Sequence, residues 1–149
     1  MKPHPGAVPK LRSRKSLARA GVQASLMSDA KWRKLFTVLR LSGVKVDQIV
    51  VKFIDSDLVH RVPIDGISLQ SPHAYMDGHF GPTPLRDIEW IEIPAMAEHS
   101  NRWPDGKGRV PPTFRKQDID GAEALLVATA RFPIERKAHG LRISGYSRG

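Results

Sequence analysis

Two histidines and an aspartate stand within seven residues of one another, at His73, Asp77 and His79. Imidazole and carboxylate groups are ordinary ligands of zinc and other divalent metals, so three such donors can converge on one ion. The spacing matches no established metal-binding motif, however, and a loop that contains Gly78 is more typical of a surface turn. The sequence therefore predicts no metal site in this segment.

A second polar group surrounds a turn, where Asp55 and Asp57 precede His60. Paired carboxylates beside a histidine could serve acid–base or Mg²⁺ chemistry, but Asp and Ser side chains in a turn also bond nearby backbone N–H groups. Glu89 and Glu92 have opposite parity on a predicted strand, so their side chains point to opposite faces. We expect no catalytic residue and no cofactor, and the sequence leans against an enzyme without deciding the question.

The segment 102–116 interleaves cations with aromatic residues, and it is the candidate binding site. Aromatic stacking combined with cationic backbone contacts is how single-stranded nucleic acid is held. Exposed Trp and Arg residues are equally typical anchors of a protein interface, and the aromatic rings could also simply fix a long loop to the domain. The predicted binding residues are Arg102, Trp103, Lys107, Arg109, Phe114, Arg115 and Lys116.

The composition limits the class of protein. The chain has 149 residues, of which 40% are hydrophobic, and this suits one domain with a real core. It contains no Cys, which excludes disulfide scaffolds, thiolate zinc sites and a cysteine nucleophile. No apolar run approaches the length of a membrane span. We expect a cytoplasmic protein with no membrane partner.

The formal net charge of +9 is concentrated in two places. Residues 1–26 carry +6 and residues 102–116 carry +4, so the remainder is close to neutral. With three prolines in its first nine positions and no aromatic residue, 1–26 is predicted to be a flexible basic tail, ahead of a domain at 27–149. Such an arm could bind phosphates; it could also be a presequence, or an extension upstream of a true start at Met27.

Hydrophobic periodicity outlines seven elements. A helix is expected from a Ser28 cap to Ser42-Gly43, because apolar residues recur at helical spacing. The other predicted elements are strands at 48–54, 58–62 and 85–93, a helix at 118–131, and strands at 132–136 and 141–146, separated by long irregular segments at 63–84 and 94–116. The order α-β-β-β-α-β-β favours a single α+β domain with a mainly antiparallel sheet and two helices.

The predicted core follows from the same pattern. Strand 48–54 has apolar residues at both parities, which indicates an interior strand covered on both faces. Trp90 is expected to be largely buried, and its replacement by Ala would cost about 3–5 kcal/mol if its ring is fully buried. The full set of predicted core residues is Trp32, Leu35, Phe36, Leu39, Val51, Phe53, Ile88, Trp90, Ile91, Leu125 and Ile143.

Four stretches carry a resemblance to a known family. They are Lys-Trp-Arg-Lys-Leu-Phe at 31–36, Lys-Phe-Ile-Asp at 52–55, Asp-Ile-Glu-Trp-Ile-Glu at 87–92, and the C-terminal Phe-Pro-Ile-Glu and Gly-Leu-Arg-Ile-Ser-Gly-Tyr at 132–146. Together they resemble an uncharacterised bacterial domain family of unknown function, over residues 28–148. The resemblance implies no activity, cofactor or catalytic residue, and it favours a domain that begins near Met27.

Two functions remain in competition. The leading hypothesis is a protein-binding module, of an accessory or toxin-neutralising type, because the framework is near neutral, the loops carry aromatic residues and catalytic motifs are missing. The alternative is a nucleic-acid-associated protein that uses the basic tail and the 102–116 segment.

Overall fold

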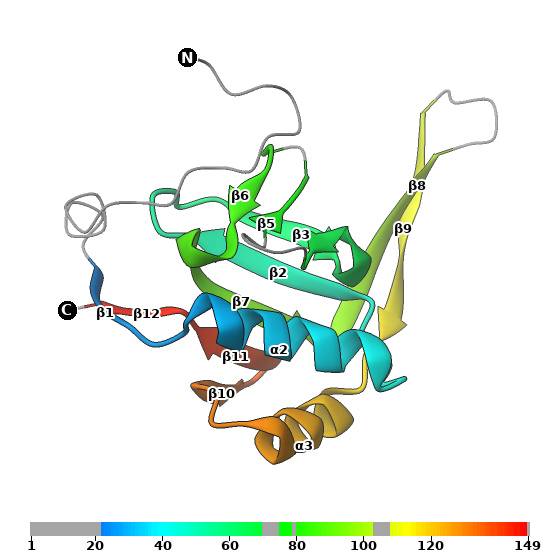
Figure 1. Ribbon diagram of the computed structural model, residues 1–149. Helices are drawn as coiled ribbons and strands as arrows, with labels where there is room; N and C mark the ends of the chain where they lie inside the picture. Colours follow the sequence, from blue (N-terminus) through cyan, green and yellow to red (C-terminus); the bar gives the residue numbers. More distant parts are fainter. Residues whose placement is uncertain (1–21, 70–74, 79, 103–107, 149) are drawn as a thin grey trace.

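The computed structural model describes residues 22–69, 75–78, 80–102 and 108–148 (Figure 1). It is an α+β fold built on a five-stranded antiparallel sheet in the order β10-β11-β7-β2-β3, which confirms the predicted class. The helices and strands are β1 (Val22–Ser25), α2 (Asp29–Leu41), β2 (Gln48–Phe53), β3 (Val59–Pro63), β4 (Ile67–Ser68), β5 (Tyr75–Met76), β6 (Thr83–Pro84), β7 (Ile88–Pro94), β8 (Met96–Arg102), β9 (Arg109–Lys116), α3 (Ile119–Thr129), β10 (Ile134–Lys137), β11 (Gly140–Ser144) and β12 (Tyr146–Arg148). Short 3₁₀ turns, Ile64–Gly66 and Leu85–Asp87, precede β4 and β7.

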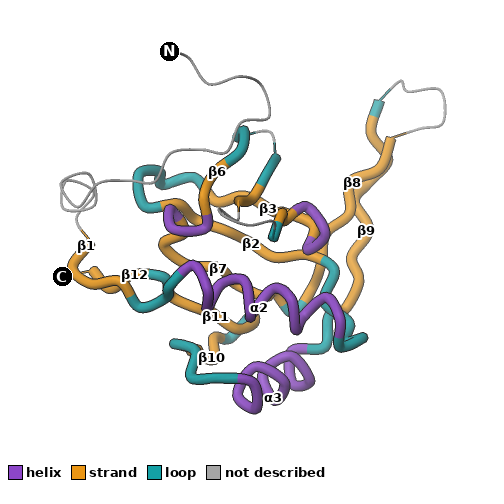
Figure 2. Tube along the Cα trace, in the orientation of Figure 1, coloured by secondary structure: helices purple, strands orange, loops and turns teal. Residues whose placement is uncertain are grey.

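Helix α2 forms where the sequence predicts it. The Ser28 hydroxyl oxygen accepts a hydrogen bond from the backbone N–H of Lys31 at 3.1 Å, which caps the first turn. The helix buries one stripe of side chains, and the rings of Trp32 and Phe36 stack with centroids 5.8 Å apart. The helix runs in front of the main sheet (Figures 1 and 2), and its buried side chains belong to the same core cluster as those of β2, β7 and β11. Burial of such large side chains supplies much of the driving force for folding.

The core lies between the two helices and one face of the sheet. Val51, Ile91 and Ile143 occupy matching positions on β2, β7 and β11, and all three are fully buried. The apolar stripe of α3, which includes Ala122 and Leu126, belongs to the same cluster. Leu125 is only half-buried, contrary to prediction, because it lies beside that stripe rather than within it.

On the opposite face of the sheet, two further expectations are wrong: the coverage of β2 on both faces and the burial of Trp90. Strand β2 is interior, between β7 and β3, but alternate residues along it are buried and half-exposed, so only one face is fully covered. Trp90 is likewise half-buried. Its ring is covered by the guanidinium of Arg142, 4.1 Å from the ring centroid, and Arg142 is in turn paired with Glu92. The stacked Arg142 guanidinium covers Trp90 in place of a helix, because the apolar faces of α2 and α3 pack into the core on the other side of the sheet.

The two segments predicted to be irregular contain strands. Within 63–84, β4, β5 and β6 form a small antiparallel sheet. Within 94–116, β8 and β9 form a two-stranded hairpin. Prolines suggested loops in both segments, but Pro84 stands at the end of β6, and Pro111 and Pro112 stand in a two-stranded ribbon. A strand in such a ribbon tolerates proline, because one of its edges need not donate to a ladder.

The described fold also begins ahead of Met27. Strand β1 lies inside the predicted tail and pairs with β12, with Val22 opposite Arg148 and Ser25 opposite Tyr146. Leu26 then donates its backbone N–H to the carbonyl of Gly145 at 2.8 Å. The rest of the predicted tail, residues 1–21, lies outside the described residues.

The structure explains why Gly and Tyr stand at the end of the C-terminal motif. A Cβ on Gly145 would collide with the carbonyl oxygen of Ile88 and lie 3.1 Å from the Trp32 ring. The hydroxyl of Tyr146 donates to the carbonyl of Arg86 at 2.6 Å, so the end of the chain is fixed to the turn before β7. Among the described residues, no helix has the length and apolar character needed to cross a membrane.

Replacing Gly145 by Ala should lower the free energy of unfolding by about 1–3 kcal/mol, because backbone must move to admit the methyl group. Chemical denaturation measures this loss. The matched control is Gly66→Ala, where the nearest atoms to an added Cβ lie at 3.5 Å, an ordinary contact distance. Equal stability of the two variants would contradict the close approach at Gly145.

Candidate interaction surface on the β8–β9 ribbon

The β8–β9 hairpin extends away from the main sheet as a two-stranded ribbon (Figure 1). Its antiparallel register runs from Met96 opposite Lys116 at the base to Arg102 opposite Arg109 at the last described pair. The ribbon therefore contains most of the predicted binding segment. The predicted residues Trp103 and Lys107 lie outside the described residues, at 103–107.

The side-chain amide of Gln117 fixes the base of the ribbon. Gln117 follows β9 directly and is 3% exposed. Its Oε1 accepts hydrogen bonds from the N–H groups of Asp47 and Gln48 at 2.8 and 3.0 Å. Its Nε2 donates to the carbonyls of Gln48 and Pro94 at 3.0 and 2.8 Å. Every donor and acceptor of this amide is satisfied by backbone, so the start of β2 and the ends of β7 and β9 are held together.

A second amide, that of Gln48, binds the edge of β8. Its Nε2 donates to the carbonyl of Glu98, and its Oε1 accepts from the N–H of Glu98, both at 2.9 Å. The amide thus pairs with β8 as a neighbouring strand would. Arg61 on β3 adds a hydrogen bond to Gln48 Oε1 at 2.8 Å and an ion pair to Glu98 at 3.4 Å. The first half of the ribbon is therefore anchored to β2 and β3.

One face of the ribbon exposes two large apolar side chains. Phe114 is 56% exposed and Met96 is 44% exposed. Because Phe114 lies opposite Glu98 and Met96 lies opposite Lys116, all four side chains share a face, with the two apolar residues on a diagonal. Arg115 lies on the other face and is exposed. In the described part of the chain, no ion pair joins Arg115 or Lys116 to a carboxylate.

The other groups that the sequence singled out are only partly described. His73 and His79 lie outside the described residues, while Asp77 is exposed beside β5. Among the described residues, no group of three histidines or carboxylates is placed to hold a metal ion. Asp55 and His60 do come together at a cavity with Asp87, whereas Asp57 is not among the lining residues of that cavity.

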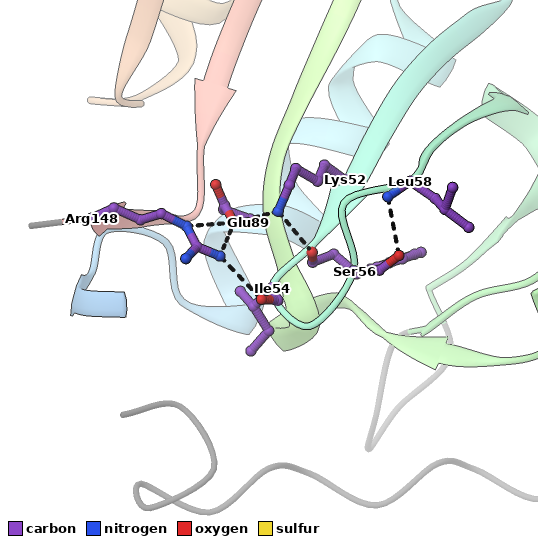
Figure 3. A network of polar contacts seen from close by, with 7 residues as sticks. Lys52, Ile54, Ser56, Leu58, Glu89 and Arg148 are labelled. Atoms are coloured by element: carbon purple, nitrogen blue, oxygen red, sulfur yellow. Dashed lines mark hydrogen bonds and ion pairs between the residues drawn. The ribbon is translucent and has the colours of Figure 1, made fainter. Parts of the chain in front are cut away.

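Sequence reasoning missed an ion cluster centred on Glu89 (Figure 3). One carboxylate oxygen of Glu89 lies 2.7 Å from Lys52 Nζ and accepts from Arg148 Nε at 2.8 Å. The same two cations also reach backbone, Lys52 at the carbonyl of Phe53 and Arg148 at the carbonyl of Ile54. The cluster thus ties β12 to β7 and β2. The charge pattern gave no signal for it, because the three residues lie far apart in the sequence.

The pKa of Glu89 reflects these contacts. Burial of the carboxyl group by itself raises its pKa, but hydrogen bonds and positive charge from Arg148 and Lys52 outweigh burial, so the pKa lies below its ordinary value of 4.5. Glu89 is therefore held as a carboxylate at neutral pH.

Comparison with known proteins gives the chain a family. The model of DUF6678, described as a family of unknown function, matches residues 14–149. The chain belongs to this family. The match confirms that the sequence motifs belong to a domain family of unknown function, and it extends ahead of them to include β1 and part of the basic tail. Searches of the curated proteins and of the solved structures found no match.

Replacing Gln117 by Ala should lower the free energy of unfolding by about 2–4 kcal/mol, since four backbone groups lose their partner at a buried site. Gln117→Glu should also destabilise, because a carboxylate cannot donate to the carbonyls of Gln48 and Pro94. Urea denaturation measures both changes, and hydrogen exchange should show early loss of protection at Asp47. Thr113→Ala, at an exposed ribbon position, is the control; equal losses for Thr113→Ala and Gln117→Ala would refute the anchoring role.

The Glu89 cluster predicts an acid-sensitive stability. Because its folded pKa lies below the unfolded value, Glu89 contributes stability above about pH 4.5, and this contribution is lost as pH falls through the folded pKa. Glu89→Gln should cost about 2 kcal/mol at pH 7, less than for a fully buried pair, and should flatten the decline of stability below pH 4.5. Urea denaturation at pH 7 and pH 4 tests this, with the exposed Glu135→Gln as control. An unchanged acid decline in Glu89→Gln would contradict the assignment.

Proposed function

We propose that this chain is a protein-binding module and that the ribbon face carrying Met96 and Phe114 is its contact surface. The observation that supports this most directly is the exposure of both side chains on one face of a ribbon that two amides anchor. Aromatic residues and Met are enriched at protein interfaces, and an exposed aromatic ring is a typical energetic anchor.

The rigidity of the ribbon strengthens the proposal. A partner that binds a flexible loop must order that loop, and the ordering reduces the affinity. Here the hydrogen bonds of Gln48 hold β8 at Glu98, directly opposite Phe114. The position of the Phe114 backbone is thereby set before a partner arrives, so its burial contributes to affinity with little ordering cost.

The charges around this face define the partner. Lys116 shares this face with Phe114, Arg115 lies on the other face of the same strand, and residues 102–116 carry +4 in total. A complementary surface has an apolar pocket for Phe114 and a rim of carboxylates, which would also speed association. We therefore propose an acidic protein partner, as an accessory or toxin-neutralising protein would have, met in the cytoplasm.

A nucleic acid is the competing partner, and one feature favours it. The major groove of DNA is about 12 Å wide and admits a two-stranded β-ribbon. The face that carries Phe114 also carries Glu98, however, and Met96 has no hydrogen-bond donor for a phosphate or a base edge. These two residues favour a protein surface over a polyanion.

Cross-linking from the ribbon tests the proposal. With a photoreactive benzoylphenylalanine in place of Phe114, the chain should cross-link to one protein in cells, and the same group at Leu41 should not. Leu41 is the matched control, since it is 82% exposed at the end of α2. With the purified partner, Phe114→Ala should weaken binding by about 2 kcal/mol, roughly thirtyfold, and Leu41→Ala should leave it unchanged, as measured by calorimetry.

Nucleic-acid binding provides the opposing outcome. Fluorescence anisotropy with single-stranded and duplex DNA at 50 and 200 mM salt should show weak binding to both. Tight binding that falls steeply with salt, and that Phe114→Ala reduces, would favour the nucleic-acid function and reject the protein partner.

A further inference from the structure

Helix α3 is apolar around most of its circumference. Its polar side chains are those of Asp120, Glu123 and Thr129. The stripe that packs into the core accounts for only part of the remaining residues and consists of Ile119, Ala122 and Leu126. Because a helix that is apolar on all sides is ordinarily covered on more than one of them, α3 has a second face suited to a contact.

This second face is exposed. Ala124, Val127 and Ala128 recur at helical spacing and so share one face, and all three are exposed, Val127 to 67%. At 3.6 residues per turn, the face lies opposite the buried stripe. On its buried side α3 packs against α2 and β11, and it lies at the periphery of the fold (Figure 1). Two alanines beside one valine allow another helix to approach closely, at an interaxial distance of about 8–10 Å.

Opposite charges stand at the two ends of this face. In the first turn, Asp120 contacts Arg136 at 2.9 Å, but its side chain is 90% exposed, so the carboxylate stays open to solvent on its other side. At the other end, Arg131 follows the helix and is exposed, and Lys31 donates to the carbonyl of Arg131 at 3.3 Å. Within the described residues, neither Lys31 nor Arg131 is paired with a carboxylate.

We propose that the exposed face of α3 pairs with the same face of a second copy of the chain, with the two helices antiparallel. Ala124, Val127 and Ala128 lie midway between Asp120 and Arg131, so one two-fold axis packs the apolar residues of both copies together. The same axis brings Asp120 of each copy to Arg131 of the other, as an isologous interface requires. A parallel arrangement would place like charges together at both ends and is disfavoured.

The length of α3 limits the strength of this contact. At 11 residues the helix is about 16 Å long, so one helix pair buries less than the roughly 1,200 Å² typical of a stable interface. We therefore expect weak, reversible dimers. Sedimentation of the full chain from about 20 μM to about 1 mM should show a monomer that converts to a dimer as concentration rises. A chain that stays monomeric over this range would overturn the proposal.

Charge reversal tests the antiparallel pairing. Arg131→Asp leaves two acids to face each other at each end of the pair, and Asp120→Arg leaves two bases, so each variant alone should stay monomeric. An equal mixture of the two should form a heterodimer, because every pair then joins opposite charges. Circular dichroism checks that both variants are folded. A mixture that stays monomeric under conditions where the unaltered chain dimerises would reject this arrangement.

Arg115→Asp is the matched control for charge. It makes the same change at an exposed position on the ribbon, so dimerisation should be unaffected. Loss of the dimer in Arg115→Asp would place the contact on the ribbon and overturn the assignment to α3.

A substitution at the centre of the face tests the apolar contact. Val127→Glu places a carboxylate where apolar side chains meet and should raise the dimer dissociation constant about tenfold or more. Leu41→Glu is the matched control, since Leu41 is an exposed apolar residue at the end of α2 and should tolerate the change. Equal dimerisation of the two variants would reject the α3 interface. The ribbon proposal is unaffected by that result, because Met96 and Phe114 take no part in the contact.

Discussion

The side-chain amide of Gln117 is the interaction on which the arrangement of the sheets depends. Its oxygen accepts two hydrogen bonds and its nitrogen donates two, all with backbone groups at the start of β2 and the end of β7. Buried backbone polar groups must be satisfied, and one amide does this at a junction where the main sheet, the ribbon and α3 meet. The ribbon can leave the main sheet at this point because its base stays fully hydrogen-bonded.

The two faces of the main sheet are covered by different kinds of structure. One face of the main sheet packs against α2 and α3, and the other relies on polar cover such as Arg142 over Trp90. Because the helices cover only one face, the framework has peripheral parts that present side chains outward. These parts are the ribbon and the β2–β3 turn. The exposed Phe114 and the cavity at the β2–β3 turn both lie where the helices do not reach.

Some of this could be read from the sequence. Periodicity located α2, α3 and the main-sheet strands because their hydrophobic faces repeat with clear spacing, as with Trp32 and Phe36. Strands β8 and β9 were not predicted, because Pro111 and Pro112 suggested a loop. Proline is excluded from the interior strands of a sheet but is tolerated in a peripheral two-stranded ribbon. Phe114 was identified as a candidate contact from its type and its basic neighbours. The sequence did not identify Gln48 and Gln117 as anchors, because a polar residue at a strand end or before a helix cap is ordinarily solvated. Only the tertiary contacts of these two residues reveal their role.

The pairing of β1 with β12 gives the molecule a mechanical weak point. Val22 and Arg148 lie opposite each other at the outer ends of an antiparallel pair, so a force that separates these two residues loads the hydrogen bonds one after another. Such a pair unzips at low force, whereas strands pulled along their length must break several bonds at once. The first step of unzipping would draw Arg148 away from Glu89, and the ion cluster would come apart before the main sheet is disturbed.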